Sequence, residues 1–321
     1  MPNQRPKIGL LLPTRGVLLR GERPPDVDLI LRQAQRAEEL GFDSVWVGDS
    51  LTSKPRLDPL TTLAAVAMRT EKVELGTSVL LGALYQPVVL ARSAATVDLL
   101  SKGRLTLALG VGGAFTPEQK RDWAHASVSR TTRAARLEEV IEVMQLLWTN
   151  QVVNFQGRFF SLEETTLEPR PFRLNGIPIW LACHHRTGND IQEQRVIRFA
   201  DGFIAITDQP QEYFDLTERL RQKSEENGRT FEDMARAFYM TVNLNNNSDT
   251  AREEADRFIR AYYGVNFWED SWGPFGKPDT VTKKIQEYFD SGAQHLIVRF
   301  ASYNQEQQLE TFAREVLPFI R

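Results

Sequence analysis

The sequence contains a single cysteine, Cys183, which excludes an internal disulfide and favours a reducing compartment. It also lacks any uninterrupted apolar run of membrane-spanning length. The first ten residues, "MPNQRPKIGL", pass directly into a strand pattern without the apolar stretch and cleavage site of a secretion signal. We therefore expect a cytoplasmic protein.

An excess of charge of one sign is absent as well. The 321 residues include 39 basic and 42 acidic side chains, which are mixed along the chain and give a net charge of -3. Proteins that bind nucleic acid or an anionic membrane usually carry a basic patch, so neither partner is expected. A small-molecule substrate is the expected partner.

Short runs of Val, Ile and Leu alternate with helical patterns that begin at Asp or Pro and end at Gly. Asp58 and Pro59 open one such helix, and Gly103 closes another. The predicted strands are residues 7–13, 42–50, 73–82, 104–113, 177–183, 201–206, 237–244 and 295–300. Eight strands, each followed by a helix, predict an α/β TIM (β/α)8 barrel.

A doubly wound sheet is the main alternative to the barrel. It normally carries a glycine-rich phosphate fingerprint after its first strand, whereas this strand ends "LLPTRGV". The stretch "VVNFQGRFFSLEE" interrupts the alternation and predicts a hairpin, with its turn at Gln156 and Gly157, inserted before the fifth strand. No flexible linker is visible, so residues 1–321 are predicted to form one domain.

The predicted third strand, "VELGTSVLLG", contains Gly76, Thr77 and Ser78 at its centre. Small polar residues weaken a sheet at such positions. The strand either merely tolerates these small residues or is shaped so that something large and flat can lie against it.

Active sites of TIM barrels lie at the C-terminal ends of the strands. Asp49 is the only carboxylate directly at a strand end in the first half of the chain, and it could orient a substrate, accept a proton or hold a ring nitrogen. A turn role in "GDSLTS" explains it equally well. The run "GVGG" at Gly110–Gly113 lets the backbone approach a ligand, although a bare glycine turn is the alternative.

The segment "ACHHRTGND" lies between a predicted strand and a helix beginning near Asp190. Free N–H groups at a helix start attract anions, so this segment predicts a site for a cofactor phosphate. An ordinary polar loop and a Cys/His metal site are the alternatives, but His125 and His295 lack zinc-ligand spacing. Cys183 is expected to be a buried residue rather than a nucleophile.

No nucleophile elbow, Walker loop or His-Glu-x-x-His motif is present. A phosphate site without an evident acid–base pair indicates that a bound cofactor carries the chemistry.

Several segments together resemble the luciferase-like (bacterial luciferase superfamily) flavin- or F420-dependent oxidoreductases. They include "GFDSVWVGDS", "DPLTTLAAVAMRT", "RLEEVIEVMQLLW" with "FQGRFF", "IPIWLAC", "FADGFI" and the block from "VELGTSVLLG" to "RLTLALGVGG". The resemblance implies a barrel with insertion segments, reduced FMN or coenzyme F420 at its C-terminal mouth, and a homodimer. It also implies a non-proline cis peptide at Ser78–Val79, against which the cofactor ring packs.

Site residues follow from strand position and from this resemblance. The candidate catalytic residues are Asp49, Ser50 and Arg299, which is expected to face the pocket from the last strand. The candidate cofactor-binding residues are Thr14, Ser78, Val79, Leu80, Gly110, Val111, Gly112, Gly113, His184, His185, Arg186, Thr187 and Gly188. No metal ligands are predicted.

The sequence departs from the family at Ser50, where many members carry a histidine. This departure counts against a histidine-based mechanism, including that of F420-dependent alcohol and sugar dehydrogenases. The sequence therefore favours a monooxygenase that uses O2 and reduced FMN, supplied by a separate reductase, on a small apolar substrate. F420-dependent hydride transfer, which would involve an F420 reductase, and a catalytically idle flavin-binding barrel are the alternatives.

Aromatic residues are concentrated in "NFWEDSWGPFGKP", between Phe267 and Phe275. This segment is predicted to be either a lid over an apolar substrate pocket or a hydrophobic cluster that anchors a long loop. The loop after the fourth strand, with Phe115, Trp123 and His125, is a second candidate for the same wall.

Overall fold

Eight parallel strands close into a barrel in the computed structural model, which describes residues 5–186, 190–266 and 272–320. Each predicted strand is confirmed, with bounds a few residues shorter at most ends. The strands are β1 Lys7–Leu11, β2 Ser44–Val47, β3 Glu74–Leu80, β4 Leu105–Leu109, β7 Ile179–Ala182, β8 Gly202–Ile206, β9 Ala235–Leu244 and β11 His295–Phe300. They are paired in the order β11-β1-β2-β3-β4-β7-β8-β9, and β9 pairs with β11 to close the barrel.

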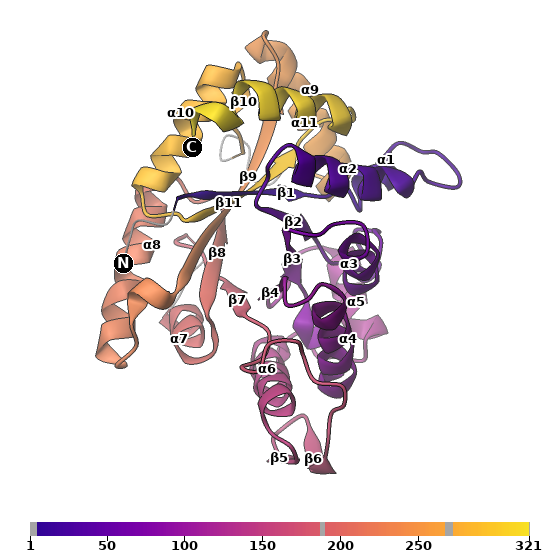
Figure 1. Ribbon diagram of the computed structural model, residues 1–321, viewed down its shortest axis with the longest axis vertical. Coiled ribbons are helices and arrows are strands. Elements are labelled where there is room, and N and C mark those ends of the chain that lie inside the picture. Colours follow the sequence, from indigo (N-terminus) through magenta and orange to yellow (C-terminus); the bar gives the residue numbers. More distant parts are fainter. Residues whose placement is uncertain (1–4, 187–189, 267–271, 321) are drawn as a thin grey trace.

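Helices cover the outside of the barrel (Figure 1). Asp58 caps α3, accepting a hydrogen bond from the Thr61 N–H at 2.8 Å, as the sequence predicts. None of the helices in the described ranges is long and apolar enough to cross a membrane. The helices are α1 Gly16–Leu19, α2 Asp28–Glu39, α3 Pro59–Ala67, α4 Pro87–Leu100, α5 Pro117–His125, α6 Arg133–Thr149, α7 Asp190–Phe199, α8 Pro210–Glu226, α9 Ser248–Tyr263, α10 Pro278–Asp290 and α11 Gln305–Glu315.

The predicted hairpin is present between α6 and β7, where Figure 1 shows it at the bottom of the view. Its strands, β5 Val153–Gln156 and β6 Ser161–Thr165, are antiparallel. The predicted turn was wrong by one residue: Gln156 pairs with Ser161, and the turn is Gly157–Phe160. A short strand that the sequence did not predict, β10 Phe275–Gly276, pairs with the end of β9.

The small residues of β3 serve different purposes. A Cβ atom on Gly76 would lie 2.1 Å from the Trp46 ring, so the space at Gly76 holds an indole of the barrel interior. Thr77 is fully buried, and its hydroxyl donates to the Ala108 carbonyl of β4 at 2.8 Å. The interpretation that Gly76 and Thr77 make room for a cofactor ring was therefore wrong.

The predicted non-proline cis peptide between Ser78 and Val79 is confirmed. The pairing of β3 with β4 is irregular over the same stretch, between Thr77 and Leu80. Ser78 and Val79 are partly exposed in a strand that is otherwise mostly buried.

Candidate active site

Two adjoining cavities lie at the C-terminal ends of the barrel strands. The large cavity, of about 640 Å³, is lined by Asp49, Ser50, Ser53, Lys54, Arg56, Leu81, Leu84, Gly113, Phe115, Gln119, Asp122, Trp123 and Tyr263. The small cavity, of about 210 Å³, is lined by Asp49, Arg56, Ser78, Val79, Leu81, Ala182, His184, Ile204, Ala205, Ile206, Tyr239, Tyr262 and Tyr263. Asp49, Arg56, Leu81 and Tyr263 belong to both linings, so the cavities meet at these residues.

The structure brings part of the predicted site together around these cavities. The predicted residues that line one or both are Asp49, Ser50, Ser78, Val79, Gly113 and His184. Those that line neither are Thr14, Leu80, Gly110, Val111, Gly112, His185, Arg186 and Arg299. Thr187 and Gly188 lie outside the described residues.

Asp49 lies where the two cavities meet. Its Oδ2 accepts hydrogen bonds from the Leu81 N–H at 3.0 Å and from the Tyr85 hydroxyl at 3.1 Å. Burial raises the pKa of this carboxyl group above its ordinary value, although both hydrogen bonds oppose that shift. Asp49 therefore links the loops after β2 and β3, and a carboxyl group with a raised pKa is suited to proton transfer.

Ser50 takes the turn role that was considered for Asp49. Its Oγ accepts a hydrogen bond from the Lys54 N–H at 3.0 Å and lies 3.1 Å from Ser53 Oγ. The hydroxyl is thus part of the loop's own hydrogen bonding.

His184 projects from the end of β7 into the small cavity. Its Nδ1 accepts a hydrogen bond from the Ile206 N–H at 3.3 Å, and burial lowers its pKa to about 4. The ring is therefore neutral at physiological pH with its proton on Nε2. His184 consequently offers the cavity a hydrogen-bond donor.

The glycine run after β4 mainly accommodates neighbouring side chains. A Cβ atom on Gly110 would lie 2.6 Å from Val79 Cγ2, and one on Gly112 would lie 2.9 Å from the Trp123 ring. Gly112 also has a φ of 76°, which favours glycine. Packing thus accounts for these two glycines, while Gly113 lines the large cavity.

The segment after β7 is held by carboxylates of α8 and of the loop that follows β8. The His185 N–H donates to Asp208 Oδ2 at 2.8 Å, and Arg186 forms an ion pair with Glu212 at 2.8 Å. Those groups are therefore bonded within the protein. A phosphate site here stays a prediction that depends on Thr187 and Gly188.

Arg299 does not face either cavity, contrary to expectation. It is 2% exposed, and it donates to the Tyr263 hydroxyl at 2.7 Å and to Thr241 Oγ1 at 2.8 Å. Its guanidinium carbon lies 4.7 Å from the Tyr262 ring centroid and 4.9 Å from that of Trp272. Arg299 therefore contacts the aromatic residues behind the cavities and not the cavities themselves.

Sequence reasoning missed Lys54, Arg56 and the tyrosines of the cavities. Arg56 donates to the Tyr262 hydroxyl at 3.2 Å across 206 sequence positions. One sequence signal was available, the adjacent Tyr262 and Tyr263 at the end of a helical pattern.

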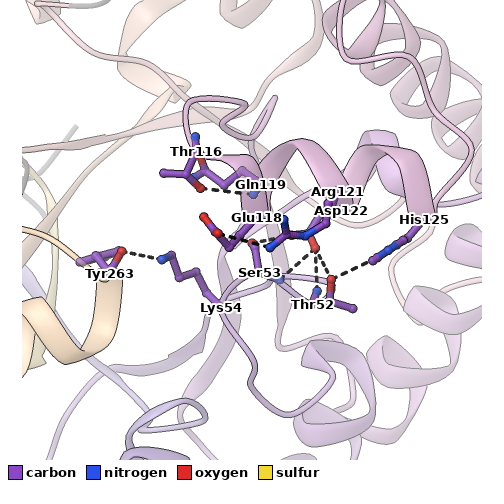
Figure 2. A network of polar contacts seen from close by, with 10 residues as sticks. All are labelled: Thr52, Ser53, Lys54, Thr116, Glu118, Gln119, Arg121, Asp122, His125 and Tyr263. Carbon is purple, nitrogen blue, oxygen red and sulfur yellow. Dashed lines mark hydrogen bonds and ion pairs between the residues drawn. The ribbon is translucent and has the colours of Figure 1, made fainter.

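Asp122 of α5 connects that helix to Thr52 and Ser53 through hydrogen bonds in one wall of the large cavity (Figure 2). Its Oδ1 accepts from the Thr52 N–H, the Thr52 hydroxyl and the Ser53 N–H at 2.6–2.9 Å, and its Oδ2 accepts from the Ser53 hydroxyl at 2.5 Å. Phe115 and Trp123 line the cavity beside it, as predicted. His125 lies 3.3 Å from the Thr52 hydroxyl and lines neither cavity.

The predicted lid is described only in part, since Phe267 and Trp268 lie outside the described residues. Trp272 is 6% exposed and stacks on Tyr263, with ring centroids 5.7 Å apart. Phe275 packs against the same hydrophobic cluster. For these two residues the arrangement agrees with a cluster that anchors the loop.

Cys183 is fully buried, and burial raises the pKa of its thiol to about 12. A thiol with that pKa is not a nucleophile, which agrees with the structural role predicted for it. Within the described parts of the chain, no three potential metal-ligating side chains gather.

Comparison with known proteins finds relatives that are similar over about nine tenths of the chain. The profile of the luciferase-like monooxygenase family matches residues 7–272. An F420-dependent glucose-6-phosphate dehydrogenase from Amycolatopsis mediterranei is 29% identical, covering 91% of this chain and 94% of the relative. A protein of the same name from Nakamurella multipartita is 30% identical, over 90% of this chain and 91% of the relative.

Solved structures share the fold. An F420-dependent secondary alcohol dehydrogenase, in complex with an F420-acetone adduct, superposes with a TM-score of 0.79 at 20% identity, covering 99% of this chain and 100% of that one. The monooxygenase RslO1 from Streptomyces bottropensis gives a TM-score of 0.82 at 23% identity, covering 98% and 100%.

Proposed function

The chain belongs to the luciferase-like monooxygenase family, and from that premise we propose that it is an oxidoreductase that transfers hydride with coenzyme F420. The observation that carries this proposal is its similarity, over 91% of its length, to an F420-dependent dehydrogenase. The sequence alone favoured reduced FMN because Ser50 replaces a histidine. The curated relatives support the F420 alternative better.

The residues of the small cavity fit the ring of such a cofactor. When bound, F420 would accept or donate a hydride at its deazaflavin ring. The Nε2–H of His184 is a donor for a ring carbonyl, and Ser78 and Val79 line the cavity. Asp49 Oδ1 accepts no hydrogen bond from the described residues, so it is available to a ligand N–H or hydroxyl group.

Asp49 is the group in this site best placed to move a proton. Hydride transfer from an alcohol releases the hydroxyl proton, and a base must accept it. Ser50 is engaged in its own turn, and His184 already accepts a hydrogen bond at Nδ1. The raised pKa of Asp49 brings that carboxylate closer to the range of an effective base.

Titration of the purified protein with F420 and, separately, with FMN tests the proposal. Saturable binding of F420 with weaker binding of FMN is expected, followed by reduction of F420 by a hydroxyl-bearing substrate. Tighter binding of reduced FMN together with substrate-dependent O2 consumption would instead establish the monooxygenase.

The FMN monooxygenase remains the second candidate, and one observation favours it. The Ser50 hydroxyl is bonded within its loop, so this position supplies no acid or base, and oxygen chemistry on reduced FMN needs fewer such groups. Cofactor binding without turnover of any substrate would indicate an idle flavin-binding barrel.

A homodimer of single-domain subunits in the cytoplasm, supplied by a separate reductase, is part of the same proposal. Light scattering of the purified protein measures the number of subunits. A monomer in that measurement would contradict the dimer.

A further inference from the structure

The polar side chains of the large cavity are mostly bonded to one another. Asp122 accepts four hydrogen bonds from Thr52 and Ser53 (Figure 2). Gln119 Oε1 accepts from the N–H groups of Phe115 at 2.9 Å and Thr116 at 3.1 Å. Because these groups satisfy each other, they are poorly available to a ligand.

The rest of the lining is mainly apolar. Leu81, Leu84, Phe115 and Trp123 form it together with the ring of Tyr263. A sugar would require hydrogen-bond partners for each buried hydroxyl group, and these residues supply none through their hydrocarbon surfaces. An aromatic or aliphatic ligand would bury its apolar surface here at no such cost.

Lys54 and Arg56 are the exceptions in this lining. Arg56 donates through Nε to the Lys54 carbonyl and through Nη1 to the Tyr262 hydroxyl, both at 3.2 Å. Its Nη2 donates to none of the described residues. Lys54 Nζ makes one hydrogen bond, to the Tyr263 carbonyl at 2.5 Å. Within the described ranges neither cation forms an ion pair with a carboxylate.

Two further arginines add positive charge behind this lining. Arg15 donates to the carbonyls of Tyr262 and Pro55 at 2.8 and 2.9 Å, and Arg299 lies beneath the same tyrosine. Burial and then the charge of Arg15 lower the pKa of Lys54. Burial alone would raise the pKa of Tyr262, but Arg56, Arg299 and Arg15 together lower it.

No carboxylate of the described residues forms an ion pair with Arg56 or Lys54. Asp49 interacts electrostatically with Arg56, but its Oδ2 accepts from the Leu81 N–H and the Tyr85 hydroxyl, and Asp122 is occupied by its four hydrogen bonds. Glu118 acts on Lys54 at longer range but forms its ion pair with Arg121, at 3.2 Å. Positive charge that is partly removed from water and unpaired favours an anionic ligand.

We propose that the large cavity binds an organic acid with an apolar body, whose carboxylate is held by Arg56 and Lys54. The free Nη2 of Arg56 and the remaining N–H groups of Lys54 supply the charged hydrogen bonds. The apolar body lies against Phe115, Trp123 and Leu84. The inference that such a ligand is the substrate rests on the proposed function. An apolar organic acid as substrate would distinguish this chain from relatives that are named for a sugar phosphate.

Binding of three probes to the full chain, with and without F420, tests the proposal. The probes are 2-naphthoate, its neutral counterpart 2-naphthylmethanol, and glucose 6-phosphate, with titration calorimetry as the measurement. We expect 2-naphthoate to bind most tightly. Arg56→Met and Lys54→Met should each weaken that binding by about tenfold, leaving the affinity for 2-naphthylmethanol unchanged.

Lys120→Met is the matched control, because Lys120 is an exposed residue of α5 that does not line the cavity. It should leave the affinity for 2-naphthoate unchanged. Circular dichroism shows whether each variant is folded, and either cavity variant alone suffices for the test. Preference for glucose 6-phosphate, or equal binding of 2-naphthoate by the wild type and both folded variants, would overturn the proposal. F420 binding is measured in a separate titration. Failure of the proposed function would appear there as absent F420 binding, whereas failure of the present proposal would appear in the binding of 2-naphthoate.

Discussion

The Nη1 atom of Arg56 donates a hydrogen bond to the Tyr262 hydroxyl at 3.2 Å, and three arginines surround this tyrosine. Their charges outweigh the effect of burial and lower the pKa of Tyr262 below the ordinary value of 10.0. We therefore predict that one tyrosine ionises below about pH 10 in the folded protein. The near-ultraviolet absorbance of tyrosinate, followed during a pH titration, measures this ionisation.

Tyr239 provides the matched control for Tyr262, since it lines the same small cavity while burial raises its pKa well above the ordinary value. The early ionisation should disappear in Tyr262→Phe and persist in Tyr239→Phe. Its persistence in Tyr262→Phe would assign it to another residue and contradict the prediction.

Asp49→Asn should reduce turnover while leaving F420 binding within a few-fold of the wild type. Loss of a general base typically costs about 10²- to 10⁴-fold in rate. Because burial raises the pKa of Asp49, activity in alcohol oxidation should rise with pH through an inflection above the ordinary value of 3.8. The pH profile of kcat/KM measures this inflection. The inflection should be absent from the residual activity of Asp49→Asn. An unchanged inflection in that variant would exclude Asp49 as the base.

The barrel could be predicted from the sequence because each βα unit carries local signals. Asp58, Pro59 and Gly103 mark helix ends through backbone chemistry that depends only on nearby residues. Position at strand ends then selected Asp49 and Ser78, which line the small cavity, without knowledge of their contacts. Such signals depend on a few neighbouring residues. They therefore predict where helices and strands begin and end, but not which distant residues come into contact.

Contacts between distant segments were not predictable in this way. Arg56 and Tyr262 meet only because the loop after β2 and the end of α9 converge at the barrel mouth. Likewise, the pattern of β3 indicated free space at Gly76 but could not tell whether a cofactor or Trp46 fills it. Both outcomes depend on side-chain packing, which a single sequence leaves open.

Asp122→Asn should destabilise the protein by about 2 kcal/mol, because the amide cannot replace the charged hydrogen bonds to Thr52 and Ser53. Burial would raise the pKa of Asp122, but those hydrogen bonds together lower it in the folded state. A lowered folded pKa stabilises the protein fully above the unfolded pKa of about 4 and progressively less below it.

Urea unfolding at several pH values tests this dependence. The wild type should lose more stability than Asp122→Asn between about pH 5 and pH 3. Asp233→Asn, at an exposed position, is the control and should follow the wild type. Equal losses in wild type and Asp122→Asn would show that the carboxylate contributes no pH-dependent stability.

Gly76→Ala should destabilise the barrel by about 1 to 3 kcal/mol, since the added Cβ would lie 2.1 Å from the Trp46 ring. Trp46 cannot easily move, because it is 1% exposed, packs 5.1 Å from the Trp180 ring and donates to the Ser44 hydroxyl at 2.7 Å. The Trp46→Phe variant removes part of the ring that the new methyl group meets. Gly76→Ala should therefore cost less in that background, and urea unfolding of the four proteins in this double-mutant cycle measures the difference. Equal costs in both backgrounds would show that Trp46 is not the reason for glycine at this position.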